Sequence, residues 1–144
     1  MILAKHHKKL GLRTKSVKKI TEIPVGEWNK VFPDVLESYD FFKTLDGSNL
    51  EQFSFYYIMV YDRKAPVGAA VCFLMNYSLD TSVSGVFRHL SNSIKKIIPN
   101  IFSLKALICG MPLGQGRIGI AGPADKILQA IVRRMEQIAK KNKV

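Results

Sequence analysis

The chain contains the stretch Ala106-Leu-Ile-Cys-Gly-Met-Pro-Leu-Gly-Gln-Gly-Arg-Ile-Gly-Ile-Ala-Gly-Pro-Ala-Asp125. This stretch begins as an apolar run typical of a strand, continues through five glycines and leads into an amphipathic helix. Glycines in front of a helix let backbone N–H groups approach an anion closely, and the helix dipole favours negative charge there. We therefore predict that Gly114–Gly122 forms a turn between a strand and a helix, where a nucleotide or coenzyme phosphate could bind. The alternative interpretation is structural: the same glycines could make a bulge and the start of the helix.

A β-hairpin is the clearest signal upstream of this stretch. The runs Phe53–Tyr61 and Val67–Tyr77 are rich in aromatic and branched residues, and they flank the turn Asp62–Ala65. Both runs are apolar throughout, so we expect both faces of the hairpin to be covered. Within the second run, Gly68-Ala69-Ala70 permits close packing of another element.

The other elements are assigned from apolar spacing and from proline and glycine punctuation. Two strands are expected, at Ser16–Ile23 and at Phe102–Met111. Three helices precede the last one: a short helix after Pro24 that Pro33 ends, a helix over Val35–Leu45 ended by Asp46-Gly47-Ser48-Asn49, and a helix over Val83–Ile94. The last helix is capped by Gly122 and begins at Pro123, and its apolar stripe runs from Ile127 to Ile138. This order predicts an α/β or α+β domain with a mixed, mostly antiparallel sheet flanked by helices.

Positive charge is concentrated at the two ends of the 144-residue chain, whose net charge is +11. Met1–Lys19 holds seven lysines and arginines and no acid. The C-terminal tail adds Arg133, Arg134, Lys140, Lys141 and Lys143 against Glu136. We expect residues 1–15 to form a flexible basic arm ahead of one domain at 16–144. The arm is either a solvated terminus or a segment that binds nucleic acid or anionic lipid.

The two cysteines, Cys72 and Cys109, lie inside apolar runs, and neither has a local partner in the sequence. We expect both to be buried, reduced thiols. The lack of a cysteine framework and of a secretory segment favours a cytoplasmic location. No run reaches the roughly 18 apolar residues that a membrane span needs.

Metal and nucleophilic chemistry are disfavoured. The histidines are His6, His7 and His89, and no Cys, His or Asp spacing fits a ligand pattern or a triad. The glycine-rich segment lacks the Gly-Lys-Ser/Thr ending of a P-loop. It formally matches Gly-x-Gly-x-x-Gly at Gly114, Gly116 and Gly119, but without the acidic residue and parallel strands of a dinucleotide-binding unit.

The hairpin Tyr61-Asp-Arg-Lys-Ala-Pro-Val-Gly-Ala-Ala-Val-Cys-Phe-Leu74 resembles that of GCN5-related N-acyltransferases, known as GNAT proteins. It is most similar to the N-terminal lobe of the two-lobed FemAB-like group. The Val35–Asn49 helix, the Leu107–Pro112 strand, the glycine turn and the helix ending at Ala139-Lys-Lys-Asn142 resemble the same lobe, so the resemblance covers roughly residues 17–144. It implies a GNAT-like fold and an acyl-CoA cofactor.

The family's acyl-CoA loop has the pattern Gln/Arg-x-x-Gly-x-Gly/Ala, whose amides cradle the pyrophosphate. Gly119 and Ala121 match its last two positions, while Gly116 stands at the Gln/Arg position and Gln115 lies one residue early. The resemblance thus implies a cofactor-binding segment made of Gly114, Gln115, Gly116, Arg117, Gly119 and Ala121.

The implied reaction moves an acyl group from CoA or a related donor to an amine. No general base can be named, because core packing or surface exposure explains Tyr56, Tyr57 and Glu51 equally well. The family continues into a further strand, so we expect an incomplete lobe that is covered by a second acyltransferase lobe or by another copy of the chain. The alternative function is a basic module that binds nucleic acid or a ribosomal surface without catalysis.

Overall fold

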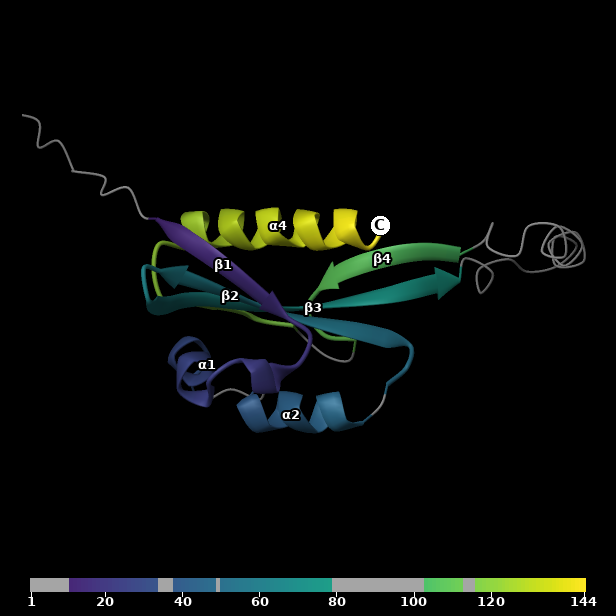
Figure 1. The fold of residues 1–144 in the computed structure, drawn as a ribbon, viewed down its shortest axis with the longest axis horizontal. Helices are drawn as coiled ribbons and strands as arrows, with labels where there is room; N and C mark the ends of the chain where they lie inside the picture. Colours follow the sequence, from purple (N-terminus) through teal and green to yellow (C-terminus); the bar gives the residue numbers. More distant parts are fainter. Residues whose placement is uncertain (1–10, 34–37, 49, 79–102, 113–115) are drawn as a thin grey trace, which may run out of the picture.

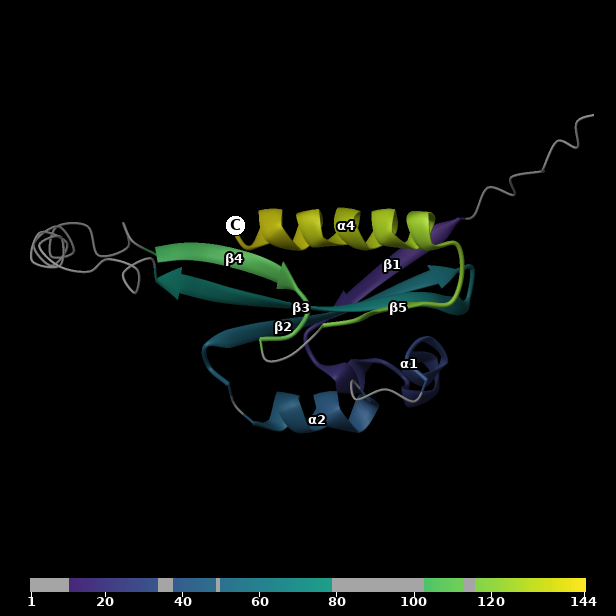
Figure 2. The same ribbon diagram turned by 180° about the vertical axis from the view of Figure 1, so that it is seen from behind.

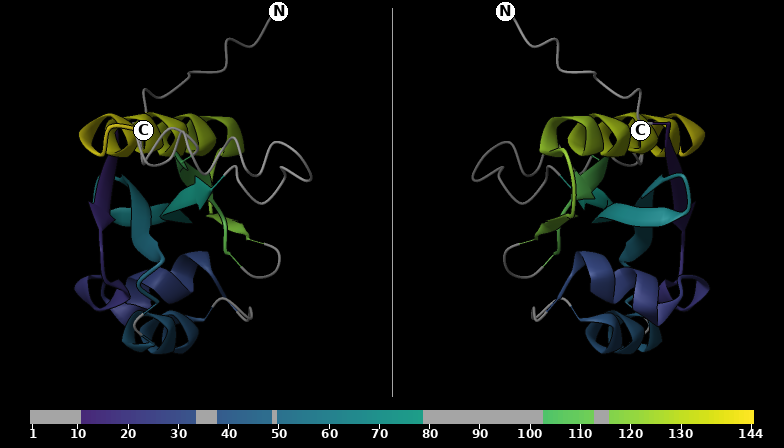
Figure 3. Two further views of the ribbon diagram at one scale, coloured as in Figure 1. Left: turned by 90° about the vertical axis from the view of Figure 1, so that its right-hand side faces the viewer. Right: turned by 90° about the vertical axis from the view of Figure 1, so that its left-hand side faces the viewer.

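The computed structural model describes residues 11–33, 38–48, 50–78, 103–112 and 116–144. These residues form three layers, in which a five-stranded sheet lies between one long helix and a pair of short helices (Figures 1 and 3). The strands are β1 (Leu12–Val17), β2 (Phe53–Asp62), β3 (Ala65–Ser78), β4 (Ser103–Cys109) and β5 (Ile118–Ile120). The pairings between these strands are antiparallel, which confirms the predicted fold class.

The helices divide between the two faces of the sheet. On one face lies α4 (Ala124–Lys141). On the other face lie α1 (Val25–Val31), α2 (Tyr39–Gly47) and the 3-10 turn η1 (Ile20–Glu22) (Figure 1). The predicted helix at Val83–Ile94 lies outside the described residues.

Each face of the hairpin carries its own core, because the side chains of a strand alternate between the two faces. Beneath α4, the sheet packs Ile58, Val60 and Cys72 against Ile127 and Ile131. On the other face, an aromatic cluster forms around the fully buried Trp28, and its rings include Phe32, Phe42 and Tyr57. The prediction that both faces of the hairpin are covered is confirmed.

The first strand lies earlier than predicted. β1 spans Leu12–Val17 and pairs with β2 from Leu12↔Asp62 to Val17↔Tyr57, whereas Ile20 belongs to the 3-10 turn and is fully buried. The predicted arm boundary at residue 15 therefore falls inside a paired strand. The basic residues Arg13 and Lys15 on an edge strand obscured its alternation, and such residues are common on sheet edges.

β3 changes partner along one of its edges. Its first part pairs with β5, from Gly68↔Ile120 to Ala70↔Ile118, and its remainder pairs with β4, from Cys72↔Cys109 to Ser78↔Ser103. Figure 2 shows β4 and β5 following one another beside β3. The glycine-rich stretch of the sequence lies at this change of partner.

Candidate functional site

The glycine-rich segment is an interrupted edge strand rather than one continuous turn. Gly110 extends the β4 ladder by one residue, because its N–H donates to the carbonyl of Val71 at 2.8 Å. The chain then leaves the sheet and returns as β5 at Ile118, opposite Ala70. The prediction that Gly114–Gly122 forms only a turn is thus wrong for residues 118–120, because their backbone pairs with β3.

The backbone of Gly110, just after β4, lies against the backbone of Gly116, just before β5; this contact is called the neck below. Gly110 has φ +129°, a conformation that side chains rarely adopt. A Cβ built on Gly116 would collide with the Cα of Gly110, so these two backbones touch. The glycines at the neck therefore serve close backbone contact, while Gly114 and Gln115 lie outside the described residues.

Gly119 is placed for packing rather than for holding a phosphate. It lies opposite Ala69 in the ladder and is buried. A Cβ at this position would lie 2.5 Å from Cγ1 and 2.8 Å from the carbonyl oxygen of Val31 in α1. Gly119 therefore lets β5 and α1 approach one another closely. The need for glycine at this position comes from a helix that lies far away in the sequence.

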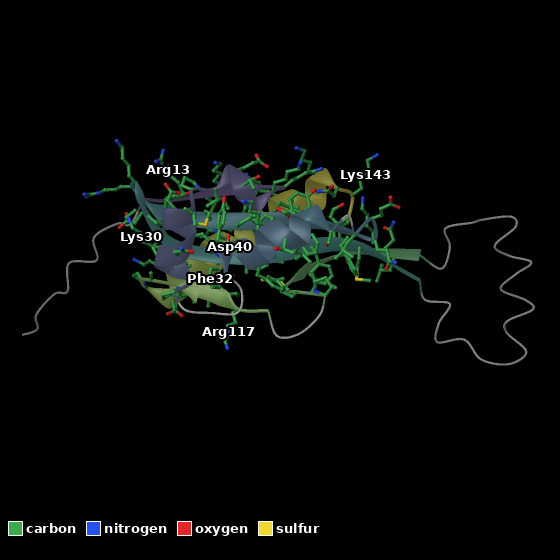
Figure 4. The ribbon with its side chains drawn as sticks, turned by 90° about the horizontal axis from the view of Figure 1, so that it is seen from below. Arg13, Lys30, Phe32, Asp40, Arg117 and Lys143 are labelled. Atoms are coloured by element: carbon green, nitrogen blue, oxygen red, sulfur yellow. The ribbon has the colours of Figure 1, made fainter. Side chains whose placement is uncertain are left out.

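The amide of Ala121 is also occupied, since it donates to the carbonyl of Val67 at 2.8 Å. The Ala121 side chain is exposed, and Arg117 is exposed and projects outward in Figure 4. The four described residues of the predicted cofactor-binding segment therefore have different places in the fold. Gly116 belongs to the neck, Gly119 and Ala121 to the sheet ladder, and Arg117 to the surface.

A strand–turn–helix unit does exist, a few residues further along than predicted. β5 ends at Ile120, the exposed residues Ala121, Gly122 and Pro123 form the turn, and α4 begins at Ala124. Pro123 occupies the N-cap position that was predicted for Gly122, and it supplies no side-chain cap hydrogen bond. The amides of the first helical turn lack intrahelical acceptors, so they point outward without a side-chain partner at the cap.

A basic groove runs between β1 and α4. Its wider part has a volume of about 590 Å³, and Lys18, Arg134 and Lys141 contribute cations to its lining. Arg134 is held in place because its Nε donates to the Ser16 hydroxyl at 3.0 Å. The acid in this lining, Glu22, already accepts from the Lys19 amide at 3.1 Å.

The groove continues toward the start of α4 as a hollow of about 440 Å³. Lys126, Arg133 and Arg134 line this part, and its lining contains no acidic residue. Arg133, Arg134 and Lys141 of the basic tail therefore lie along one groove beside β1.

Two of the three side chains considered as a general base, Tyr56 and Tyr57, already donate their hydroxyl protons within the fold. The Tyr57 hydroxyl donates to Asp46 Oδ1 at 2.7 Å, and burial together with this bond raises the pKa of Tyr57. Tyr56 packs in the core beneath α4, and its hydroxyl donates to Asn142 Oδ1 at 3.2 Å. Glu51 lies on an exposed turn before β2, away from α4.

The two cysteines meet across the sheet, a contact that spacing in the sequence did not reveal. Cys72 lies opposite Cys109 in the β3–β4 register. Cys72 is buried as expected, but Cys109 is exposed and lies on β4, at the edge of the sheet. The hydrogen bond from the Cys72 thiol lowers the pKa of Cys109 to about 7, whereas that contact and burial raise the pKa of Cys72.

No protein-family model matches the chain, and comparisons with curated proteins and with solved structures return no match. Within the described part of the chain, no helix is long and apolar enough to cross a membrane. The same residues include no group of three or more His, Cys, Asp or Glu side chains that could hold a metal ion.

Proposed function

We propose that this domain is an N-acyltransferase-like lobe that binds an acyl-CoA donor at the turn between β5 and α4. The observation that carries the proposal is the exposed connection Ala121–Pro123, which leads directly into an 18-residue helix without a side-chain cap. Outward amides and the positive end of a helix dipole favour a pyrophosphate at such a turn. The resemblance of the sequence to GNAT proteins supports the same function, as does the position of α4 directly after an edge strand of an antiparallel sheet.

The residues of this turn fit a coenzyme phosphate in chemistry and in access. The first-turn amides supply N–H donors, and Lys126 adds a positive charge within the first turn, beside the acidic Asp125. A bound acyl-CoA would supply the activated thioester. The chain's own part would be to position the donor beside an amine acceptor.

A pair of substitutions at Ala121 tests the site. Its side chain is exposed, so Ala121→Glu and Ala121→Gln differ in charge and hardly in size. We expect Ala121→Glu to weaken CoA binding at least about tenfold by charge repulsion, with Ala121→Gln close to the original chain. Titration calorimetry measures both affinities, and equal melting temperatures show that both variants fold. Equal CoA affinity for the two variants, or no CoA binding by the original chain, would eliminate the proposal.

We further propose that a second lobe or another copy of the chain covers the edge formed by β4 and β5. Large apolar side chains are exposed along this edge, at Leu104, Ile108, Ile118 and Ile120. Sedimentation of the original chain and of Ile108→Lys tests the second copy, and we expect the lysine to shift the chain toward monomer. Identical monomeric sedimentation of both would exclude self-association through this edge.

The basic groove supports a second candidate function, the binding of nucleic acid. Lys18, Arg134 and Lys141 gather along one groove with Arg133 and Lys126. Cations spaced along a groove bind a phosphate backbone by releasing counterions, so affinity falls steeply with salt. Lys141→Gln should weaken oligonucleotide binding and reduce the salt slope by about 1, whereas Lys30→Gln on α1 should change neither. Fluorescence anisotropy at two salt concentrations distinguishes this function from CoA binding.

A further inference from the structure

The geometry of Cys72 and Cys109 is that of a directly opposed, non-hydrogen-bonded pair. Bonded and non-bonded pairs alternate along an antiparallel ladder. The next pair, Val71 and Gly110, is a bonded one, because the Gly110 N–H donates to the Val71 carbonyl. The cysteine pair is therefore non-bonded, and the Cα atoms of such a pair lie about 4.5 Å apart with the side chains on the same face.

This separation suits a disulfide. Bonded cysteines have Cα atoms about 4.4–6.8 Å apart, so the two sulfurs can join without displacement of either strand. Both residues are free thiols, and they lie directly opposite one another in the β3–β4 register. The pair is thus reduced but placed for oxidation.

The two thiols differ in the way that an attacking and a resolving cysteine differ. Cys109 is exposed on the edge strand β4, where a small molecule can reach its sulfur. Cys72 is fully buried beneath α4, where solutes cannot reach it directly. The hydrogen bond from Cys72 favours the thiolate of Cys109, which is the reactive form.

We propose that Cys109 and Cys72 form a reversible thiol–disulfide exchange site whose co-reactant is a low-molecular-weight disulfide. The Cys109 thiolate attacks one sulfur of that disulfide, the co-reactant's S–S bond breaks, and one small thiolate leaves. The Cys72 thiol then attacks the Cys109 sulfur and gives its proton to the departing small thiolate, so that the second small thiol leaves. The protein pair is oxidised by two electrons, and the co-reactant is reduced to two thiols.

The position of the bond gives it a structural consequence. It would join β3 to β4 at the last residue of β4, next to the Gly110–Gly116 neck. Cross-linking residues far apart in the sequence restricts the unfolded chain. Oxidation is therefore expected to raise the melting temperature and to fix the point at which β3 changes partner.

The test uses the folded 144-residue chain and oxidised glutathione as the probe. Mass spectrometry follows the product with time, and proteolysis under conditions that block free thiols identifies the cross-linked peptides. We expect a transient glutathione adduct on Cys109, followed by a chain that has lost two hydrogens and contains a Cys72–Cys109 linkage. Reduced glutathione in excess should return both thiols.

Matched variants assign the two roles. Cys72→Ser should stop at the glutathione adduct on Cys109, and Cys109→Ser should react far more slowly because Cys72 is buried. Iodoacetamide should alkylate Cys109 several-fold more slowly in Cys72→Ala, which lacks the hydrogen-bond donor, than in Cys72→Ser, which keeps one. A stable adduct on Cys109 in the original chain, or equal reactivity of the two cysteines, would overturn the proposal. These readouts do not depend on CoA binding.

Discussion

Asp46 in α2 accepts a hydrogen bond from the Tyr57 hydroxyl of β2 at 2.7 Å. Its second carboxylate oxygen accepts from the amide of Ile20 at 2.7 Å. Tyr57 and Ile20 are both fully buried. One carboxylate therefore joins the 3-10 turn, α2 and the sheet.

Removal of this carboxylate should be costly. Asp46→Ala leaves a buried hydroxyl and a buried amide without an acceptor, so we expect the free energy of unfolding to fall by about 2–3 kcal/mol. Tyr57→Phe removes donor and hydroxyl together and should cost about 1 kcal/mol. Denaturant titration measures both. Asp46→Asn, which keeps one acceptor oxygen, should fall between them, and an Asp46→Ala chain as stable as the original would contradict this role.

The same pair predicts a loss of stability at alkaline pH. Burial and the bond to Asp46 raise the pKa of Tyr57 above its ordinary 10, and burial beside Glu27 raises that of Tyr61 to about 12. Below about pH 10 both hydroxyls are neutral in the folded and unfolded chain, so their contribution is complete. Above it, the unfolded chain loses these protons first, and the free energy of unfolding falls. Unfolding titrations from about pH 8 to about pH 11 check this, and Tyr57→Phe should flatten the decline.

Alanine substitutions at Gly119 and Gly26 compare a glycine with neighbours at its Cβ position with one that has none. Gly119→Ala would press a methyl group against Val31, whose backbone oxygen cannot move away, so we expect a loss of about 2–3 kcal/mol. Gly26 lies in α1 with nothing near its Cβ position, and Gly26→Ala should stabilise the chain by about 0.5–1 kcal/mol. Thermal unfolding of both variants gives the comparison. A tolerated Gly119→Ala would show that α1 does not pack on β5 at this distance.

Much of the fold could be predicted because its signals are local. The apolar runs of β2 and β3, the prolines around α1 and the stripe of α4 each reveal an element without reference to the rest of the chain. β5 escaped prediction because three residues, Ile118–Ile120, are too few to show alternation among glycines. The constraint on Gly119 comes from α1, far away in the sequence, and local spacing carries no trace of it.

The candidate site was harder to predict for the same reason. The strand–turn–helix pattern identified the junction that leads into α4. Which backbone amides there already donate within the sheet depends on the β3–β5 register, and this register could not be derived from the glycines alone. The pairing of Cys72 with Cys109 also depends on the register of β3 and β4, which are not consecutive along an uninterrupted hairpin in the sequence. Basic residues near the two ends of the chain were noted as two clusters, and only the packing of α4 against the sheet brings Lys18 into one groove with Arg134 and Lys141.

The start of the folded domain can be tested by two deletions. Removal of residues 1–15 takes away Leu12–Lys15, which pair with Asp62–Met59 of β2. It also removes the bond from the Arg13 guanidinium to the Arg63 carbonyl, 2.9 Å, and that from Lys15 Nζ to the Glu22 carbonyl, 3.1 Å. We expect the melting temperature to fall by about 10 °C, because the edge of β2 and the side of α4 next to Leu12 lose their cover.

Removal of residues 1–10 is the control, since it leaves every residue of β1 in place. The difference between the two deletions then measures the contribution of Gly11–Lys15 alone, whatever the first ten residues do. Scanning calorimetry of the original chain and both deletions provides the three melting temperatures. If the two deletions melted at the same temperature, the pairing of β1 with β2 would contribute nothing to stability, and the folded domain would begin at residue 16, as its sequence first indicated.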